Sequence, residues 1–176
     1  MNTNTDSDLG FIFGRRSIRV YSPGEISEAA VTKLLEAAMA APSAAAKDPW
    51  HFVVIRDRKA LERLAPALSG GDMLLQGGLA IAVCGDLEAA HDRQLSFLLQ
   101  DASAAIENAL LAAHLLGLGA CWLGVHPREE RIATLRALLG LPARIVPVSV
   151  IALGWPRERK DPRTRFQPGR VHREKW

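Results

Sequence analysis

Three arginines and a serine lie within five residues near the start of the chain, in the run Arg15-Arg16-Ser17-Ile18-Arg19. Each guanidinium can hold two oxygens of a phosphate at once, and the serine hydroxyl can add a further hydrogen bond. The run follows a short helix predicted over residues 8–14, with Asp8 as its N-cap. Because a dense group of cations is also typical of a solvated surface, the run by itself only indicates a phosphate-binding site.

Few other residues are spaced for catalysis. The sequence contains no GxGxxG or GxxxxGK[ST] nucleotide-binding loop and no HExxH or GxSxG motif. The five histidines do not cluster with acids at metal-ligand spacing, so no metal site is expected. One face of a long predicted helix carries polar residues, a pattern more typical of a solvated or inter-helix stripe than of an acid–base pair. This stripe consists of Gln100, Ser103, Glu107 and His114.

The formal net charge of +3 is unevenly distributed over the 176 residues. Residues 1–156 have a net charge of −2, whereas residues 157–176 form a basic tail with a net charge of +5. Such a tail could contact nucleic acid or an acidic partner. However, Phe166, Val171 and Trp176 interleave with its charges, which favours docking on a protein surface, and no recognition-helix pattern accompanies it. We therefore expect no nucleic-acid partner.

Length and composition are typical of one globular domain over residues 1–176, since 48% of the residues are hydrophobic and 23% are charged. The two cysteines, Cys84 and Cys121, are too few and too far apart for a disulfide scaffold or a zinc ribbon. The N-terminus lacks the pattern of a secretion signal, and no run of about 18 apolar residues predicts a membrane span. We expect a cytoplasmic protein without a membrane partner.

Apolar periodicity predicts the elements that must hold these residues in place. Strands and helices alternate along the chain. Helices are expected over residues 27–41, 58–67, 95–116 and 127–139, and strands over 51–55, 79–84, 120–123 and 145–153. The helix over 95–116 is apolar nearly all round, which is typical of a buried central helix, and its small residues would also let a second subunit approach. The pattern predicts an α+β fold with a sheet under long helices and an extended C-terminal tail.

An ordered set of motifs resembles the nitroreductase family of FMN-dependent oxidoreductases. The first is the arginine run at 15–19. It is followed by Ala41-Pro42-Ser43-Ala44, Pro49-Trp50-His51-Phe52, Gln100-Asp101, Gly117-Leu118-Gly119-Ala120-Cys121-Trp122-Leu123-Gly124-Val125, Gly140-Leu141-Pro142 and Gly154-Trp155-Pro156. The tail, with Arg165-Phe166, Arg170-Val171-His172 and Trp176, is similar to those of shorter members. Each motif is modest by itself, but the ordered set covers nearly the whole chain.

The resemblance implies a nitroreductase-like homodimer with two FMN sites at the subunit interface. It implies that Arg15, Arg16 and Ser17 hold the FMN phosphate and ribityl chain. It further implies that Arg165, with Arg163, closes on the phosphate from the tail. Guanidiniums match a phosphate in both charge and geometry, so these assignments are physically consistent.

The resemblance also implies how the flavin ring is held. Arg19 would lie by the pyrimidine edge, where a cation stabilises the charge of reduced flavin. The segment Pro42-Ser43-Ala44 would approach the ring from the other subunit, and Leu123 and Gly124 would offer backbone N–H groups toward flavin N5. One departure concerns Ala46 and Asp48, which stand where family members often carry Asn and Gln. This changes the flavin contacts expected of that loop.

The expected activity is an NAD(P)H oxidoreductase that uses FMN to reduce nitroaromatic, quinone or similar small acceptors. NADH or NADPH would pass hydride to flavin N5, and the acceptor would then enter the same pocket in a ping-pong scheme. No side chain is needed as a catalytic acid or base. Two alternatives stay open: a specialised member of the same fold for flavin cleavage, dehalogenation or dehydrogenation, and a flavin-binding protein without turnover.

Overall fold

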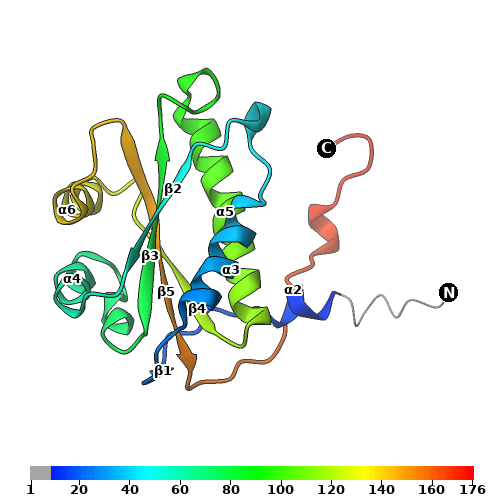
Figure 1. Ribbon diagram of the computed structural model, residues 1–176. Helices are drawn as coiled ribbons and strands as arrows, with labels where there is room; N and C mark the ends of the chain where they lie inside the picture. The colour runs from blue at the N-terminus through cyan, green and yellow to red at the C-terminus, as the bar shows by residue number, and fades with distance from the viewer. Residues whose placement is uncertain (1–8) are drawn as a thin grey trace.

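A single antiparallel sheet forms the centre of the molecule. The computed structural model describes residues 9–176. Its main strands lie in the order β2 (Trp50–Ile55), β3 (Leu79–Asp86), β5 (Ile145–Pro156) and β4 (Gly119–Gly124). A two-residue strand, β1 (Tyr21–Ser22), pairs with the last two residues of β5. The strand β5 therefore joins every other part of the sheet except β2 (Figure 1).

Helices cover both faces of this sheet (Figure 1). On one face lie α3 (Glu28–Met39) and α5 (Leu95–Leu115), and on the other lie α4 (Arg58–Leu64) and α6 (Glu129–Leu139). The short helix α2 (Gly10–Gly14) packs against α5. Short 3₁₀ turns complete the elements, at Ala44–Ala46 (η1), Ala65–Ala67 (η2), Gly71–Leu75 (η3), His91–Arg93 (η4) and Pro168–Arg170 (η5). Across residues 9–176, no helix has the length and apolar character needed to cross a membrane.

Two hydrophobic cores sandwich the sheet. Leu34 of α3 and Ile106 of α5 pack with Ile151 and Leu153 of β5 on one face. On the opposite face, the cluster under α4 and α6 contains Val150, which alternates with Ile151 along the same strand. Successive side chains of a strand point to opposite faces, so an almost continuously apolar strand can serve both cores. This explains why β5 is buried on both faces, as its apolar run predicts, and the central strand β3 is buried on both faces in the same way.

Most predicted elements are confirmed, with differences at their ends. Ser27 caps α3 as expected, because its hydroxyl accepts the Ala30 N–H at 3.2 Å. The predicted end of the helix over 58–67 is wrong. The α-helix α4 ends at Leu64, and a 3₁₀ turn, η2, follows it, because Pro66 has no N–H for an α-helical hydrogen bond. Asp8, the predicted cap of the first helix, lies outside the described residues.

Two features of β5 depend on distant parts of the chain. The strand runs to Pro156, three residues beyond the prediction, because β1 supplies a partner for its end. Near its start, Val83 pairs with Ser149 but Cys84 pairs with Pro147, so Val148 is an extra residue on β5. Proline cannot donate a ladder hydrogen bond, and a bulge is where a strand tolerates it. The Val148 carbonyl instead accepts the N–H groups of Val125 and His126.

Candidate functional site

The arginine run 15–19 lies along the outer edge of β4. Ser17 forms a parallel bridge with Ala120, and the Ile18 N–H donates to the Ala120 carbonyl at 3.0 Å. Two residues later, Tyr21 is buried, with its hydroxyl 2.7 Å from the Ile18 carbonyl oxygen and 3.3 Å from that of Ala152. Burial raises the pKa of Tyr21, so its hydroxyl remains protonated and able to donate. The second half of the run is thereby fixed to the sheet.

Two glycines of the sequence motifs make room for this run. A Cβ atom on Gly154 would lie 2.7 Å from the Tyr21 ring, and one on Gly119 would lie 2.8 Å from the Ile18 side chain. Both distances are shorter than a carbon–carbon contact allows. Gly119 and Gly154 are thus required by the close packing of residues 18–21 on the sheet.

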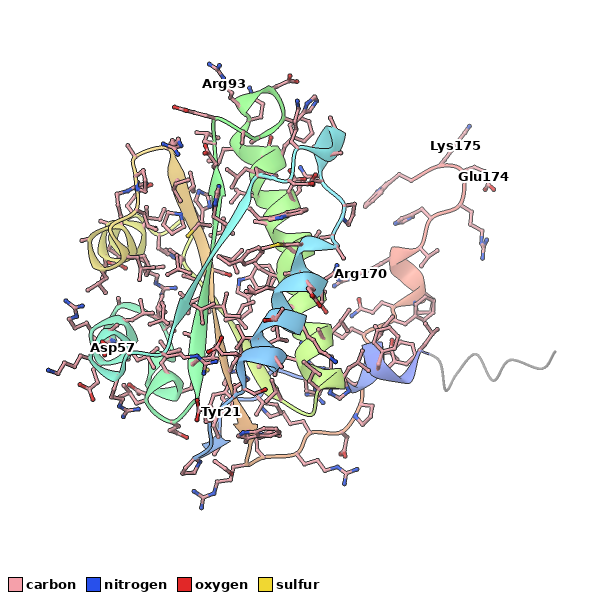
Figure 2. All side chains as sticks on the ribbon, in the orientation of Figure 1. Tyr21, Asp57, Arg93, Arg170, Glu174 and Lys175 are labelled. Carbon is pink, nitrogen blue, oxygen red and sulfur yellow. The ribbon has the colours of Figure 1, made fainter. Side chains whose placement is uncertain are left out.

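The first part of the basic tail folds back onto the same run. Its backbone is held at two points, where the Arg157 N–H donates to the Val20 carbonyl at 2.9 Å and the Arg163 N–H donates to the Phe13 carbonyl at 3.1 Å. Residues 161–176 are exposed throughout, and Figure 2 shows Arg170, Glu174 and Lys175 on the part of the tail that stands away from the sheet. The tail therefore has an anchored segment, 157–163, and a protruding segment, 164–176.

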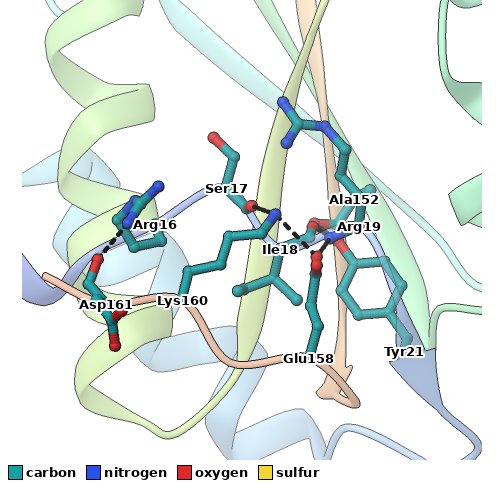
Figure 3. A network of polar contacts seen from close by, with 9 residues as sticks. All are labelled: Arg16, Ser17, Ile18, Arg19, Tyr21, Ala152, Glu158, Lys160 and Asp161. Carbon is teal, nitrogen blue, oxygen red and sulfur yellow. Dashed lines mark hydrogen bonds and ion pairs between the residues drawn. The ribbon is translucent and has the colours of Figure 1, made fainter.

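Side chains reinforce the anchored segment (Figure 3). The Glu158 carboxylate accepts the Arg19 backbone N–H at 2.6 Å and pairs with Lys160 at 3.1 Å. Lys160 Nζ also donates to the Ser17 carbonyl at 2.8 Å, and the Arg16 guanidinium donates to the Asp161 carbonyl. In Figure 3 the Arg19 side chain extends away from Glu158, so its guanidinium remains available to a ligand.

A pocket of about 560 Å³ lies between the run and the tail. Its lining is almost entirely basic and contains no carboxylate: Ile12, Arg15, Arg16, Ser17, Arg19, Lys160, Arg163 and Arg165. We call it the basic pocket. An adjoining hollow of about 440 Å³ shares Arg15, Arg16 and Lys160 with it. The structure thus brings together every residue predicted to hold a phosphate, from two segments nearly 150 residues apart.

Two residues of the polar stripe on α5, Glu107 and His114, contact the end of α2 as predicted, whereas Gln100 and Ser103 donate to carbonyls of their own helix. Arg15 Nε lies 2.9 Å from Glu107 Oε1, and both side chains are partly exposed. A Cβ on Gly14 would be 2.8 Å from His114 Nε2, so the imidazole packs directly on the end of α2. These contacts join the start of the arginine run to α5. Arg15, the ion-pair partner of Glu107, also lines the basic pocket.

The contacts of Glu158 that fix the anchored segment of the tail depend on pH. Hydrogen bonding to the Arg19 N–H, with the Lys160 cation nearby, lowers the pKa of Glu158 below its usual value of 4.5. Because the pKa of Glu158 is lower in the folded state than in the unfolded state, its ionised carboxylate stabilises the fold at pH values above the unfolded-state pKa. This stabilisation is lost as the pH falls through the folded-state pKa.

We expect Glu158→Gln to destabilise the protein at pH 7 by no more than about 1 kcal/mol, because the pair is partly exposed. The difference from wild type should shrink below about pH 4. Urea unfolding at pH 7 and pH 3.5 measures both effects. Asp161→Asn is the matched control, since no hydrogen bond or ion pair of its carboxylate is found within residues 9–176. An equal Glu158→Gln effect at both pH values would contradict this role.

The end of β4 presents a free backbone edge. The Ala120 carbonyl points away from β5, toward Ile18. The backbone N–H and C=O of one residue point to the same side of a strand, and those of the next residue point to the other side. The backbone groups of Trp122 and Gly124 therefore also point away from β5. Consistent with this, the outward Gly124 carbonyl accepts a hydrogen bond from Arg131 at 2.8 Å. The backbone N–H and C=O of Leu123 point the other way, toward β5. Of the two amides predicted to reach a flavin, that of Gly124 is the one that this geometry leaves available.

The loop containing Pro42, Ser43 and Ala44 does not line the basic pocket of its own chain. It lies between α3 and β2, where the Ser43 hydroxyl donates to Asp48 Oδ1 at 2.5 Å and accepts the Asp48 N–H at 2.9 Å. The carboxylate of Asp48 is therefore engaged within the loop. Three non-glycine residues have a left-handed backbone, with φ of 50° at Ala45, 51° at Ala46 and 47° at Asp48. The loop that departs from the family pattern is thus a strained one.

Relieving this strain should stabilise the protein. We expect Ala46→Gly to raise the free energy of unfolding by about 1 kcal/mol, since the left-handed conformation costs alanine more than the extra chain entropy costs glycine. Thermal and urea unfolding measure the change. Ala37→Gly, in the last turn of α3, is the control and should lose up to about 1 kcal/mol. A loss of stability in both variants would show that the strain at Ala46 is negligible.

Neither cysteine supplies a nucleophile to the site. Burial raises the pKa of Cys84 to about 12, and burial also raises that of Cys121. Both thiols are therefore protonated near neutral pH. Among the described residues, no group of three or more His, Cys, Asp or Glu side chains could hold a metal ion.

Comparison with known proteins shows the family of the chain. A model of the nitroreductase family matches residues 12–71 and 67–155. The chain belongs to the nitroreductase family. A protein of Archaeoglobus fulgidus, provisionally named NADH dehydrogenase/NAD(P)H nitroreductase, is 50% identical over 171 residues, covering 96% of this chain and 98% of that protein.

Solved structures extend the nitroreductase match to the fold. A crystal structure from Parabacteroides distasonis, with the same provisional name, has a TM-score of 0.90 and 37% identity, covering 97% of this chain and 99% of that one. A nitroreductase structure from Desulfovibrio desulfuricans in complex with FMN has a TM-score of 0.82 and 35% identity, covering 96% of each chain. The predicted nitroreductase-like α+β fold is confirmed.

Sequence reasoning missed three residues of this nitroreductase-family site. Lys160 lines the basic pocket, Glu158 holds the Arg19 amide, and Tyr21 ties the arginine run to β5. Tyr21 is the single tyrosine of the chain, which was the one signal available for it. Nothing in the tail sequence distinguishes the charged residues of the anchored segment from those of the protruding segment, because the position of the tail depends on its contacts with residues 13–20.

Proposed function

We propose that this chain is an FMN-dependent NAD(P)H oxidoreductase that reduces nitroaromatic, quinone or similar small acceptors. The observation that carries the proposal is the basic pocket, where six cationic side chains and Ser17 converge without a lining carboxylate. Membership of the nitroreductase family and the FMN bound in a structural neighbour support the choice of cofactor. NADH or NADPH is the electron donor, in keeping with the name of the Archaeoglobus fulgidus relative.

The pocket suits a phosphate monoester, which carries nearly two negative charges at neutral pH. We assign the phosphate and ribityl chain to Arg15, Arg16 and Ser17, with Arg163 and Arg165 closing from the tail. Guanidinium groups bind phosphate oxygens in pairs, so this set supplies both charge and direction. Lys160 adds a further cation, although it is already shared between Glu158 and the Ser17 carbonyl.

The flavin ring would extend from the pocket along the free edge of β4. There the outward Gly124 amide can donate to the N5 region, and the Arg19 guanidinium can stabilise negative charge at the pyrimidine edge. FMN, when bound, supplies the redox chemistry by taking a hydride at N5 from NAD(P)H and passing electrons to the acceptor in ping-pong fashion. The chain's own residues bind and orient, and none is needed as a catalytic acid or base.

A homodimer would complete the site. Pro42, Ser43 and Ala44 do not line the basic pocket of their own chain, so we propose that they reach the flavin of a second copy. Large apolar side chains are exposed and available to such an assembly. Leu115 at the end of α5 is 67% exposed, and Phe166 in the protruding tail is 70% exposed.

Absorption spectroscopy of the purified protein tests the proposal. The protein should bind FMN, appear yellow and bleach under anaerobic NADH or NADPH, with colour restored by a nitroaromatic or a quinone. Sedimentation of the same sample should give the mass of a dimer. A colourless protein that fails to take up added FMN would contradict the proposed function.

A further inference from the structure

Asp101 occupies an unusual position for an acidic residue. It lies on the second turn of α5 and is only 5% exposed, which makes it the one buried carboxylate among residues 9–176. Its neighbours on the helix, Leu98, Ala102 and Ala105, belong to the hydrophobic core between α5 and the sheet. Burying a charged group in such a core is costly unless its hydrogen bonds compensate. Packing therefore does not explain why an acid is found here.

The hydrogen bonds of Asp101 indicate its role. Oδ1 accepts the backbone N–H of Ala44 at 2.9 Å, whereas Oδ2 is buried and finds no hydrogen-bond partner among the described residues. Between residues 43 and 48, every other recorded hydrogen bond stays within the loop. The Asp101–Ala44 bond is thus the one polar tether in this part of the structure that joins the loop to another element.

A tether is needed because the loop conformation is strained. Its left-handed residues, Ala45, Ala46 and Asp48, are not glycines, so the loop has little intrinsic preference for this shape. Strained backbone persists where surrounding structure holds it. The Ser43–Asp48 bonds close the loop on itself but do not fix it to the sheet or the helices.

We propose that Asp101 is a positioning residue that fixes loop 43–48 on α5, so that Pro42, Ser43 and Ala44 are presented to the flavin. The inference rests on the proposed function, in which that segment contacts the cofactor. Asp101 itself does not touch the flavin, since its side chain is buried and engaged with the Ala44 amide. The hydrogen bond to Ala44 requires an acceptor oxygen on residue 101 and does not require a negative charge.

Paired substitutions separate these properties. Asp101→Asn keeps an oxygen that can accept the Ala44 N–H, whereas Asp101→Leu keeps the branched shape, is larger and has no acceptor. Asp57 is the matched control, because its carboxylate also accepts one backbone N–H, that of Ala60 at 2.8 Å, but on α4 across the sheet (Figure 2). Asp57→Asn and Asp57→Leu repeat the two changes away from the site.

Three measurements follow on the full-length protein: hydrogen exchange of the amides in 43–48, titration with FMN, and visible circular dichroism of bound FMN. For Asp101→Leu we expect exchange at least about tenfold faster, an FMN Kd at least about tenfold higher and an altered flavin spectrum. Asp101→Asn should stay within about threefold of wild type in exchange and Kd. Asp57→Leu should lower the melting temperature while leaving all three measurements unchanged.

The opposite results would overturn the inference. Unchanged loop exchange and FMN affinity in Asp101→Leu would do so, as would an equal loss of affinity in Asp57→Leu. If the leucine variant does not fold, Asp101→Ala removes the same acceptor and replaces it in each comparison. Wild-type protein that binds no FMN would instead overturn the proposed function, and loop exchange, which needs no flavin, would still decide whether Asp101 holds the loop.

Discussion

Replacing Arg15 with alanine is expected to raise the Kd of FMN by roughly 30- to 150-fold, equivalent to about 2 to 3 kcal/mol. Arg15 lines the basic pocket, and its guanidinium is already oriented by the ion pair with Glu107 at 2.9 Å. An oriented guanidinium loses little side-chain entropy on binding a phosphate, so its two charge-assisted hydrogen bonds contribute nearly their full strength. Titration of the flavin-free protein with FMN, followed by flavin fluorescence, measures the change.

Two companion variants define what the loss means. Arg15→Lys keeps the charge without the paired geometry and should give an intermediate Kd. Arg173→Ala removes an arginine from the protruding tail, outside the basic pocket, and should leave the Kd near that of wild type. If Arg15→Ala binds FMN as tightly as wild type, the phosphate is held elsewhere and the assignment of the arginine run is wrong.

Replacing Gly124 with valine is expected to reduce FMN affinity by at least about tenfold while leaving stability nearly unchanged. A Cβ on Gly124 meets no atom within 4 Å, and its φ is not in the left-handed region. Valine is also favoured in strands, so the protein should accept it. A flavin ring approaching the Gly124 amide would instead meet the added side chain, because only glycine leaves the backbone uncovered.

Combining stability and binding makes this substitution informative. Thermal unfolding of the flavin-free variant should match wild type, whereas FMN titration should not. Gly169→Val is the matched control, since a Cβ there also meets no atom within 4 Å and the residue lies in the tail turn η5. Normal FMN affinity in Gly124→Val would place the ring away from the end of β4, and a large loss of stability would show that Gly124 serves the fold.

The elements that could be predicted are those decided by neighbours in sequence. Ser27 caps α3 because its hydroxyl needs only the amide three residues later. The apolar run of β5 predicts burial on both faces, and the structure confirms it. In contrast, β1 has only two residues and exists because Tyr21 and Ser22 meet the end of β5. No local pattern encodes such a pairing.

The site divides in the same way. A phosphate-binding role for residues 15–19 could be predicted from their types and spacing, since three guanidiniums and a hydroxyl in five residues suit a phosphate. The partners of that run were not evident. The tail contributes Lys160, Arg163 and Arg165 to the same pocket only because residues 157–163 fold back onto residues 13–20. The tail's charge, by itself, was equally consistent with a surface for acidic partners.

The sequence by itself determined the family and the order of the main elements, and it predicted phosphate binding by residues 15–19, because each depends on residue types and short-range periodicity. Only the tertiary structure decided which residues act together. It showed that Gly119 and Gly154 serve the packing of Ile18 and Tyr21, that the Gly124 amide faces outward and the Leu123 amide inward, and that Asp101 tethers a loop 57 residues away. These facts concern contacts between distant segments, whose geometry is set by the packing of the whole chain around the sheet.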